Sequence, residues 1–450
     1  MVKIALGVTA LLFALVLLAA CNGDGDTKTA RPTPSGPVTV TVWHSMPNPA
    51  GGSLQLIADQ FNESQSVYVI ELIFQGGYTD SLNKLINTAS AVNKPAVIQL
   101  SDASTQIMID SGIITPIQAF IDDEGYDLSD FESKALAYYT IDGTFYAMPF
   151  NLSGPILYYD RHAFESAGLD PDQPPRTLEE VREASRILVD SGASQYGISL
   201  QTSAWFFEQL LAKSGALYAN NGNGRDGRAT EAVFDSEEGI AIIRWWDEMV
   251  ADGLAYNAAS DAIDAMLKLA TGEAAMAIGS TAALRISISL LRVAAADPLQ
   301  YDTAAMPGPD GEGGGIALGG AAFWVINERS EDEQLGAWEF LKFAASPERQ
   351  AQWHSDTGYF PTRLSAYDLP AAAQARAEFP QFTTAIDQLR AAPDNRATQG
   401  VLLAPLNAVR DRLVKAFELV LAGDADPASE LQAAADEATE IIQEYNRTVQ

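Results

Sequence analysis

Arg410 is a basic residue whose neighbours suggest chemistry. In the helix expected around it, Arg410 shares one face with Leu406, Leu413 and Phe417, at spacings of four, three and seven residues. A buried cation needs a partner, so two interpretations follow. The guanidinium forms an internal ion pair with one of the many carboxylates, or it binds an anionic ligand, most simply phosphate, through two parallel hydrogen bonds.

Polar and aromatic side chains also follow the ends of predicted strands. These residues are Trp43, His44, Tyr78 and Asp102. In open α/β sheets, ligands bind in the crevice beyond the carboxyl ends of the strands, so these side chains mark a candidate site. The alternative is that each is an ordinary solvated loop residue. Further along, Gly319 and Gly320 would let a ligand approach backbone N–H groups.

The chain lacks the sequence patterns of common catalytic sites. It has three histidines, and it contains no HExxH motif, no nucleophile elbow and no Walker A sequence. Carboxylates are so numerous that a glycosidase-like pair would be a coincidence of number. The loop NGNGRDG at residues 221–227 resembles a calcium loop, but Arg225 stands at a ligand position, which favours a tight turn. No enzyme activity, cofactor or metal is expected.

Composition restricts the partners and the domain number. The 28 basic and 59 acidic residues give a formal net charge of −31. Nucleic acid is excluded as a partner, because phosphate-backbone binding needs a basic footprint. The acidic residues are spread along the whole chain, which favours a role in solubility. A mature chain of about 430 residues exceeds one hydrophobic core, so two domains are expected.

The N-terminus has the features of a lipoprotein leader. Lys3 precedes an apolar run at residues 4–18, and small residues lead into Cys21, the one cysteine of the chain. This predicts a signal peptide at residues 1–20, rather than a membrane span, and lipid attachment at Cys21. The alternative for Cys21 is a buried free thiol. Residues 21–37 are expected to form a flexible tether.

Alternating strand and helix patterns would position the candidate residues in a first lobe. Strands are predicted at residues 38–44, 67–74 and 96–100, and helices are predicted around residues 54–61 and 80–91. Ser53 would cap the first helix. Tyr78 would lie in the loop after the second strand. This β-α-β-α-β order predicts a mostly parallel sheet with helices on both faces.

A second lobe is expected after the stretch PFNLSGPILYYD at residues 149–160. Its segment ILYY predicts a buried strand, and the irregular NLSGP before it is interpreted as the first crossing between the lobes. From residue 316, the strand-like ALGGAAFWVIN crosses back. The other predicted elements are a helix at residues 178–189, a helix through Trp245 and Trp246, a strand at residues 274–280, and helices over residues 371–450.

Five sequence blocks resemble one protein family. They are WHSM, GGY, PFNLSGPILYYDRHAFESAGLDPDQPP, GGAAFWVIN and WHSDTGYFP. These blocks are similar to those of the extracytoplasmic solute-binding proteins of ABC importers. Within that family they most resemble the branch that binds glycerol-3-phosphate and glycerophosphodiesters such as glycerophosphocholine. The resemblance covers nearly the whole mature chain.

The resemblance implies an α/β fold of the maltose-binding-protein type, in which two lobes close on a ligand about a hinge of several strands. One lobe would comprise residues 38–148 and 316–365, and the other residues 149–315 and 366–450. The protein would be a monomer, anchored by lipid outside the cytoplasmic membrane or in the periplasm. It would deliver its ligand to a membrane permease.

The resemblance also implies a set of ligand-binding residues. They are Tyr78, Asp102, Ser153, Trp205, Ser280, the backbone of Gly319 and Gly320, Tyr359 and Arg410. The family tends to carry more than one tryptophan near Trp205, whereas two phenylalanines follow it here. Either Ser280 or Thr281 would face the ligand. Two alternatives stay open: a clamp of the same fold for a neutral sugar, with Arg410 in an internal salt bridge, and a structural lipoprotein.

Overall fold

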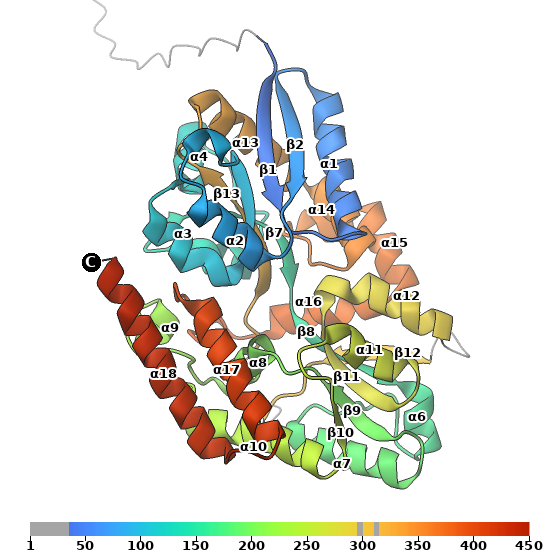
Figure 1. The fold of residues 1–450 in the computed structure, drawn as a ribbon. Helices are drawn as coiled ribbons and strands as arrows, with labels where there is room; N and C mark the ends of the chain where they lie inside the picture. The colour runs from blue at the N-terminus through green and yellow to red at the C-terminus, as the bar shows by residue number, and fades with distance from the viewer. Residues whose placement is uncertain (1–35, 295–299, 310–314, 450) are drawn as a thin grey trace, which may run out of the picture. The chain divides into compact units, whose positions relative to one another are not determined.

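The computed structural model describes residues 36–294, 300–309 and 315–449. The predicted signal peptide, Cys21 and most of the tether lie outside these residues. The described part contains two β-sheets, each flanked by helices, and strands β7 and β8 lead from one sheet to the other (Figure 1). In the described ranges, no helix is both long enough and apolar enough to cross a membrane.

The first sheet has the strand order β2-β1-β3-β13-β4, and β7 pairs with β13. Its strands are β1 (Val38–His44), β2 (Tyr68–Phe74), β3 (Val97–Ser101), β4 (Ile114–Thr115), β7 (Met148–Ser153) and β13 (Gly319–Ile326). Strands β1, β2 and β3 are parallel, as predicted. However, β13 runs antiparallel to β3, β4 and β7. Strands β4 and β7 therefore point the same way as β1, β2 and β3. The sheet is mixed because β13, which returns from the second lobe, enters it in the opposite direction.

Helices cover this sheet and bury its aliphatic side chains. They are α1 (Ala50–Ser64), α2 (Tyr78–Asn87), α3 (Thr105–Ser111), α4 (Ile117–Glu124), α5 (Ser133–Tyr139), α13 (Glu331–Ala344) and α14 (Pro347–Thr357), with short 3₁₀ turns η1 (Ala91–Asn93) and η2 (Asp102–Ser104) and the hairpin β5 (Thr140–Ile141) and β6 (Thr144–Phe145). Leu54, Ile57 and Phe61 of α1 face the core, as their spacing predicts. The prediction that Ser53 caps α1 is wrong, since α1 begins a turn earlier, after Pro49.

The second sheet is also mixed, in the order β10-β9-β11-β8-β12. Its strands are β8 (Pro155–Asp160), β9 (Tyr196–Leu200), β10 (Ala255–Asn257), β11 (Ala274–Ser280) and β12 (Tyr301–Ala305). Strand β9 runs parallel to β10 and β11, and β8 runs antiparallel to β11 and β12. The parallel strands β9 and β11 end at the same edge, beside the first lobe.

The second lobe is richer in helices than the first. They are α6 (Arg161–Ser166), α7 (Leu178–Asp190), α8 (Ala204–Ser214), α9 (Asn220–Gly224), α10 (Glu237–Ala251), α11 (Ala262–Ala270), α12 (Leu284–Ala294), α15 (Pro370–Glu378), α16 (Gln381–Ala391), α17 (Leu406–Leu421) and α18 (Pro427–Thr448), with 3₁₀ turns η3 (Thr281–Ala283) and η4 (Ser365–Asp368). The predicted tight turn at residues 221–227 is confirmed. Asn221, Gly222 and Asn223 adopt left-handed backbone angles there, which form one short turn.

The first crossing occurs at Gly154, between β7 and β8. The prediction that Asn151 to Ser153 belong to neither lobe is wrong, because these residues complete β7 and pair with the start of β13. A Cβ atom on Gly154 would lie 2.9 Å from Ile316 Cδ1, so the two crossing segments pack tightly against each other. Two adjacent segments therefore join the two sheets.

His354 on α14 gives the first lobe a pH-dependent stability. Its ring is 1 % exposed, and Nδ1 lies 2.7 Å from the carbonyl oxygen of Tyr359. Burial lowers the pKa of His354 from 6.5 to about 4. The unfolded chain therefore takes up this proton at a higher pH than the folded chain. We expect the free energy of unfolding to decrease by up to about 3 kcal/mol from this residue as the pH falls from 6.5 to 4.

Urea unfolding at several pH values tests this expectation. His354→Asn should reduce the pH dependence in that range. The same pH dependence in wild type and His354→Asn would contradict the assignment.

Candidate functional site

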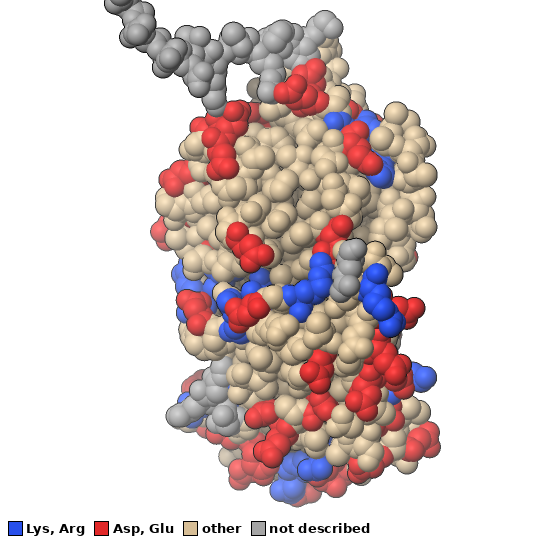
Figure 2. Space-filling view, turned by 90° about the vertical axis from the view of Figure 1, so that its left-hand side faces the viewer, with Lys and Arg blue, Asp and Glu red and all other residues tan. Residues whose placement is uncertain are grey.

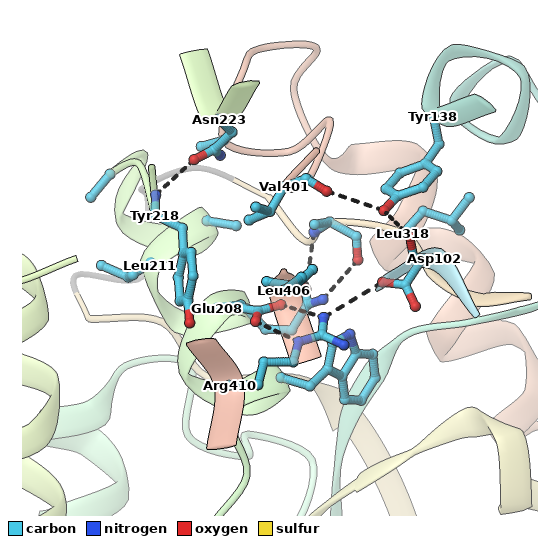
Figure 3. A pocket seen from close by; sticks show the side chains of 17 residues that line it. Asp102, Tyr138, Glu208, Leu211, Tyr218, Asn223, Leu318, Val401, Leu406 and Arg410 are labelled. Carbon is cyan, nitrogen blue, oxygen red and sulfur yellow. Dashed lines mark hydrogen bonds and ion pairs between the residues drawn. The ribbon is translucent and has the colours of Figure 1, made fainter. Parts of the chain in front are cut away.

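A small pocket lies where the two lobes meet (Figure 3). Asp102 and Tyr138 line it from the first lobe. The second lobe contributes Trp205, Glu208, Tyr218, Leu406 and Arg410. The space inside is about 20 Å³, roughly the room that one water molecule needs. A ligand as large as a glycerol phosphate therefore enters only if lobes or side chains move apart.

Arg410 is held by two carboxylates at the centre of this pocket. Its Nε donates to Glu208 Oε1 at 2.7 Å, and its Nη2 donates to Glu208 Oε2 at 2.6 Å. From the other lobe, Asp102 Oδ2 lies 3.6 Å from the same Nη2. Figure 3 shows both carboxylates turned toward the guanidinium. Arg410 thus lies between the lobes, and it forms the ion pair that was one of its two predicted interpretations.

The titration of this cluster follows from burial and charge. Burial disfavours the charged guanidinium, but the charge and hydrogen bonds of Glu208 outweigh it, so the pKa of Arg410 is raised. Burial also raises the pKa of Asp102, where the charge of Arg410 opposes the shift and that of Glu208 adds to it. The guanidinium is therefore a permanent cation, whose charge Glu208 already neutralises.

The sequence analysis did not identify Glu208. Its signal is visible in retrospect, because Glu208 is the one acidic residue of the apolar helix segment AWFFEQLLAKS. It follows Trp205 by three residues, so both side chains lie on one side of α8. A carboxylate there is 8 % exposed, and an isolated buried charge demands a cationic partner.

Tyr138 is a second residue that the sequence analysis missed. Its hydroxyl donates to the carbonyl oxygens of Asp102 at 3.1 Å and Val401 at 3.3 Å. Arg225 of the second lobe donates to the Tyr138 carbonyl oxygen at 3.1 Å, and its guanidinium lies 4.7 Å from the centre of the Tyr138 ring. Tyr138 therefore fixes the backbone of Asp102 and contacts the second lobe at the same time.

Tyr78 and Tyr359 lie together on the first-lobe side. The prediction that Tyr78 lies in a loop is wrong: it is the first residue of α2, because Asp80 Oδ2 accepts a hydrogen bond from Gly77 N at 3.0 Å and starts the helix there. Asn151 Nδ2 donates to the Tyr78 hydroxyl at 3.0 Å. Burial raises the pKa of both tyrosines, so each phenol stays protonated and can donate a hydrogen bond.

The two predicted glycines do not line the pocket, and protein groups lie against both of them. A Cβ on Gly319 would lie 2.8 Å from Trp205 Cζ2, so the indole packs on this backbone. A Cβ on Gly320 would lie 2.1 Å from the Asn151 carbonyl oxygen. Ser153 pairs with Gly319 across β7 and β13 and is 5 % exposed. The groups that approach these glycines belong to the chain, and the approach of a ligand to their N–H groups stays a prediction.

Ser280 lies apart from the Arg410 pocket. It lines an apolar groove of about 460 Å³ between α11 and α12. Its hydroxyl accepts a hydrogen bond from Ala282 N at 3.1 Å. Thr281 is fully buried and bonds Gly154 at the crossing, through its hydroxyl and its backbone N–H. Of the two candidates, Ser280 is therefore the one whose residue lines an open groove, and its contact with a ligand stays a prediction.

Two residues at predicted strand ends do not line the Arg410 pocket. Trp43 is 5 % exposed, and Lys84 Nζ lies 4.6 Å from its ring centre. His44 is 7 % exposed and packs on Phe74. Both are buried residues at the carboxyl end of β1, rather than the solvated loop residues that the alternative interpretation expected.

The surface charge agrees with the even spread of acidic residues along the sequence. On the face drawn in Figure 2, most Lys and Arg side chains lie in a band across the middle. Asp and Glu side chains lie above, within and below this band, without forming one continuous patch.

Comparison with known proteins agrees with this architecture. Residues 57–381 match the family described as bacterial extracellular solute-binding proteins. The chain is 30% identical to the sn-glycerol-3-phosphate-binding periplasmic protein UgpB of Rhizobium meliloti, over 89% of this chain and 93% of that protein. It is 29% identical to UgpB of Salmonella typhimurium, over 91% and 93%.

Solved structures share the fold. UgpB from Mycobacterium tuberculosis in complex with glycerophosphocholine superimposes with a TM-score of 0.76 at 24% identity, covering 93% of this chain and all of that one. The cyclic α-maltosyl-1,6-maltose binding protein of Arthrobacter globiformis gives 0.73 at 23% identity, covering 91% of this chain and 100% of that one. Fold and family agree: the chain belongs to the bacterial extracellular solute-binding proteins and has the two-lobe fold of the maltose-binding-protein type.

Proposed function

We propose that this protein binds sn-glycerol-3-phosphate or a glycerophosphodiester such as glycerophosphocholine and delivers it to an ABC import permease by closure of its lobes. The observation that carries the proposal is the position of Arg410, which lies between the lobes within reach of Asp102 from the first lobe and beside Trp205 of the second. Relatives that match about nine-tenths of this chain are named as glycerol-3-phosphate-binding proteins.

The residue types around Arg410 suit such a ligand. Asp102 can accept hydrogen bonds from two glycerol hydroxyls, and Ser153 and glycine N–H groups can donate to phosphate oxygens. Ser280 could join them only if the lobes moved, because it lines the separate groove between α11 and α12. Neutral hydrogen bonds contribute roughly 0.5–1.5 kcal/mol each, and charged ones roughly 1.5–3 kcal/mol. The rings of Tyr78, Trp205 and Tyr359 can cover the polyol or a cationic head group. A handful of these contacts gives micromolar binding or better after association costs.

The remaining features follow from this role. The lobes would divide at residues 38–148 plus 316–365 and 149–315 plus 366–450, so that β7, β8 and the segment before β13 act as the hinge. A lipid on Cys21 would hold a monomer at the outer face of the cytoplasmic membrane or in the periplasm. Binding and release suffice for the task, so no catalytic activity and no cofactor is required.

A neutral sugar is the second candidate ligand. The observation that favours it is the ion pair of Arg410 with Glu208, which satisfies the guanidinium without an anion. Structural neighbours of the same fold include proteins described with maltose and other saccharides.

Thermal unfolding in the presence of a ligand panel separates the two candidates. Glycerophosphocholine or glycerol-3-phosphate at 100 times its dissociation constant should stabilise the folded chain by about 2.7 kcal/mol and raise the melting temperature. Maltose and trehalose serve as controls and should give no shift. A shift with these sugars and none with the phosphates would replace the phosphate proposal by the sugar one.

A further inference from the structure

The carboxylate of Glu208 occupies the position at Arg410 that a ligand phosphate would take. It accepts from Nε and Nη2 at 2.7 and 2.6 Å, which is the bidentate geometry in which arginine also binds phosphate. The pair is buried, with side chains 18% and 8% exposed. We propose that Glu208 is a specificity-determining residue, which makes the cleft select zwitterionic glycerophosphodiesters over dianionic phosphate monoesters. This inference rests on the proposed function.

Charge around the pocket supports this selection. When both carboxylates are ionised, Asp102 and Glu208 place two negative charges around the single positive charge of Arg410. Arg225 is the other cation nearby. It does not line the pocket, and its Nε and Nη1 donate to the carbonyl oxygens of Gly400 and Tyr138. The pocket at Arg410 therefore offers an incoming anion no net positive charge.

A phosphate can bind at this arginine in two ways, and the second of them is worse for a dianion than for a monoanion. It can displace Glu208, whose carboxylate is then buried without its partner. It can also bind beside Glu208, where like charges repel in proportion to the ligand charge. A phosphate monoester carries about −1.5 to −2 at pH 7, whereas a diester carries a single negative charge. A quaternary ammonium group on the diester balances that charge.

The same side of α8 provides a place for the cation. Trp205 precedes Glu208 by three residues, so its indole and the carboxylate lie on neighbouring positions of the helix surface. An aromatic face beside a carboxylate is a favourable environment for a quaternary ammonium group. The single side chain of Glu208 thus weakens the binding of a dianion and strengthens the binding of a zwitterion.

Isothermal titration calorimetry tests the proposal with glycerophosphocholine and sn-glycerol-3-phosphate at pH 7.5. Wild type should bind the diester at least about tenfold more tightly than the monoester, which is about 1.4 kcal/mol. Glu208→Gln keeps the shape and removes the charge, so it should tighten monoester binding at least about tenfold. Glu440→Gln is the matched control, because it removes one negative charge at an exposed position of α18 and should leave the ratio unchanged.

Equal affinities in wild type, or a ratio that Glu208→Gln does not change, would overturn the role of Glu208. The wild-type comparison decides this point even if Glu208→Gln does not fold. Failure of the proposed function has another outcome: neither phosphate compound would then bind to wild type or to either variant.

Discussion

Replacement of Arg410 by methionine is expected to lower the free energy of unfolding by about 3–5 kcal/mol. Methionine fills a similar volume, so the loss does not come from a cavity. It arises because Glu208, 8 % exposed, keeps a buried charge without its bidentate partner, and Asp102 loses the cation 3.6 Å from its Oδ2. Urea unfolding followed by circular dichroism measures the change.

Two further variants test whether the unpaired charge of Glu208 causes this loss of stability. Arg410→Met combined with Glu208→Leu removes both charges, and it should recover most of the lost stability, since a buried pair is often replaceable by apolar side chains. Lys415→Met removes a charge from an exposed position of the same helix and should change stability by less than about 0.5 kcal/mol. A double variant as unstable as Arg410→Met would show that the ion pair is not the source of the effect.

This expectation differs from what the sequence suggests. The apolar stripe of α17 predicts a buried guanidinium that needs a partner, and the structure confirms both its helix and its place between the lobes. From sequence alone, the partner could equally be a ligand, in which case removal of Arg410 would leave the fold intact. Glu208 lies 202 residues away, and no local pattern links the two positions.

Some elements of the fold follow from local sequence patterns, and others do not. Strands β1, β2 and β3 follow from alternation and the β-α-β order, which are local properties. The antiparallel entry of β13 depends on where the chain returns from the second lobe, which the pattern of residues 316–326 does not contain. The start of α2 depends on the side chain of Asp80, which shifts Tyr78 from a loop into the first helical turn.

The last prediction concerns Gly320, where β13 packs against β7 next to the crossing between the lobes. Gly320 is the second residue of β13 and has φ +124°, and a Cβ there would lie 2.1 Å from the Asn151 carbonyl oxygen. Gly320→Ala should lower the free energy of unfolding by about 3 kcal/mol or more, since a strained φ costs of order 1–3 kcal/mol and overpacking adds a similar amount. Asn151 also bonds the Tyr78 hydroxyl, so a displaced β7 should weaken ligand binding as well.

Gly423→Ala is the matched control for backbone strain. Gly423 follows α17 with φ +77, and no atom lies within 4 Å of the position its Cβ would take. Alanine there should cost only about 1–2 kcal/mol, the penalty of a left-handed residue in open space, and should leave ligand affinity unchanged. Both variants force alanine to a positive φ, so the difference between them reports the close contact of β13 with β7 together with the less favourable φ of Gly320. Equal losses in the two variants would mean that the chain relieves this contact by local adjustment, and that the crossing tolerates a side chain at Gly320.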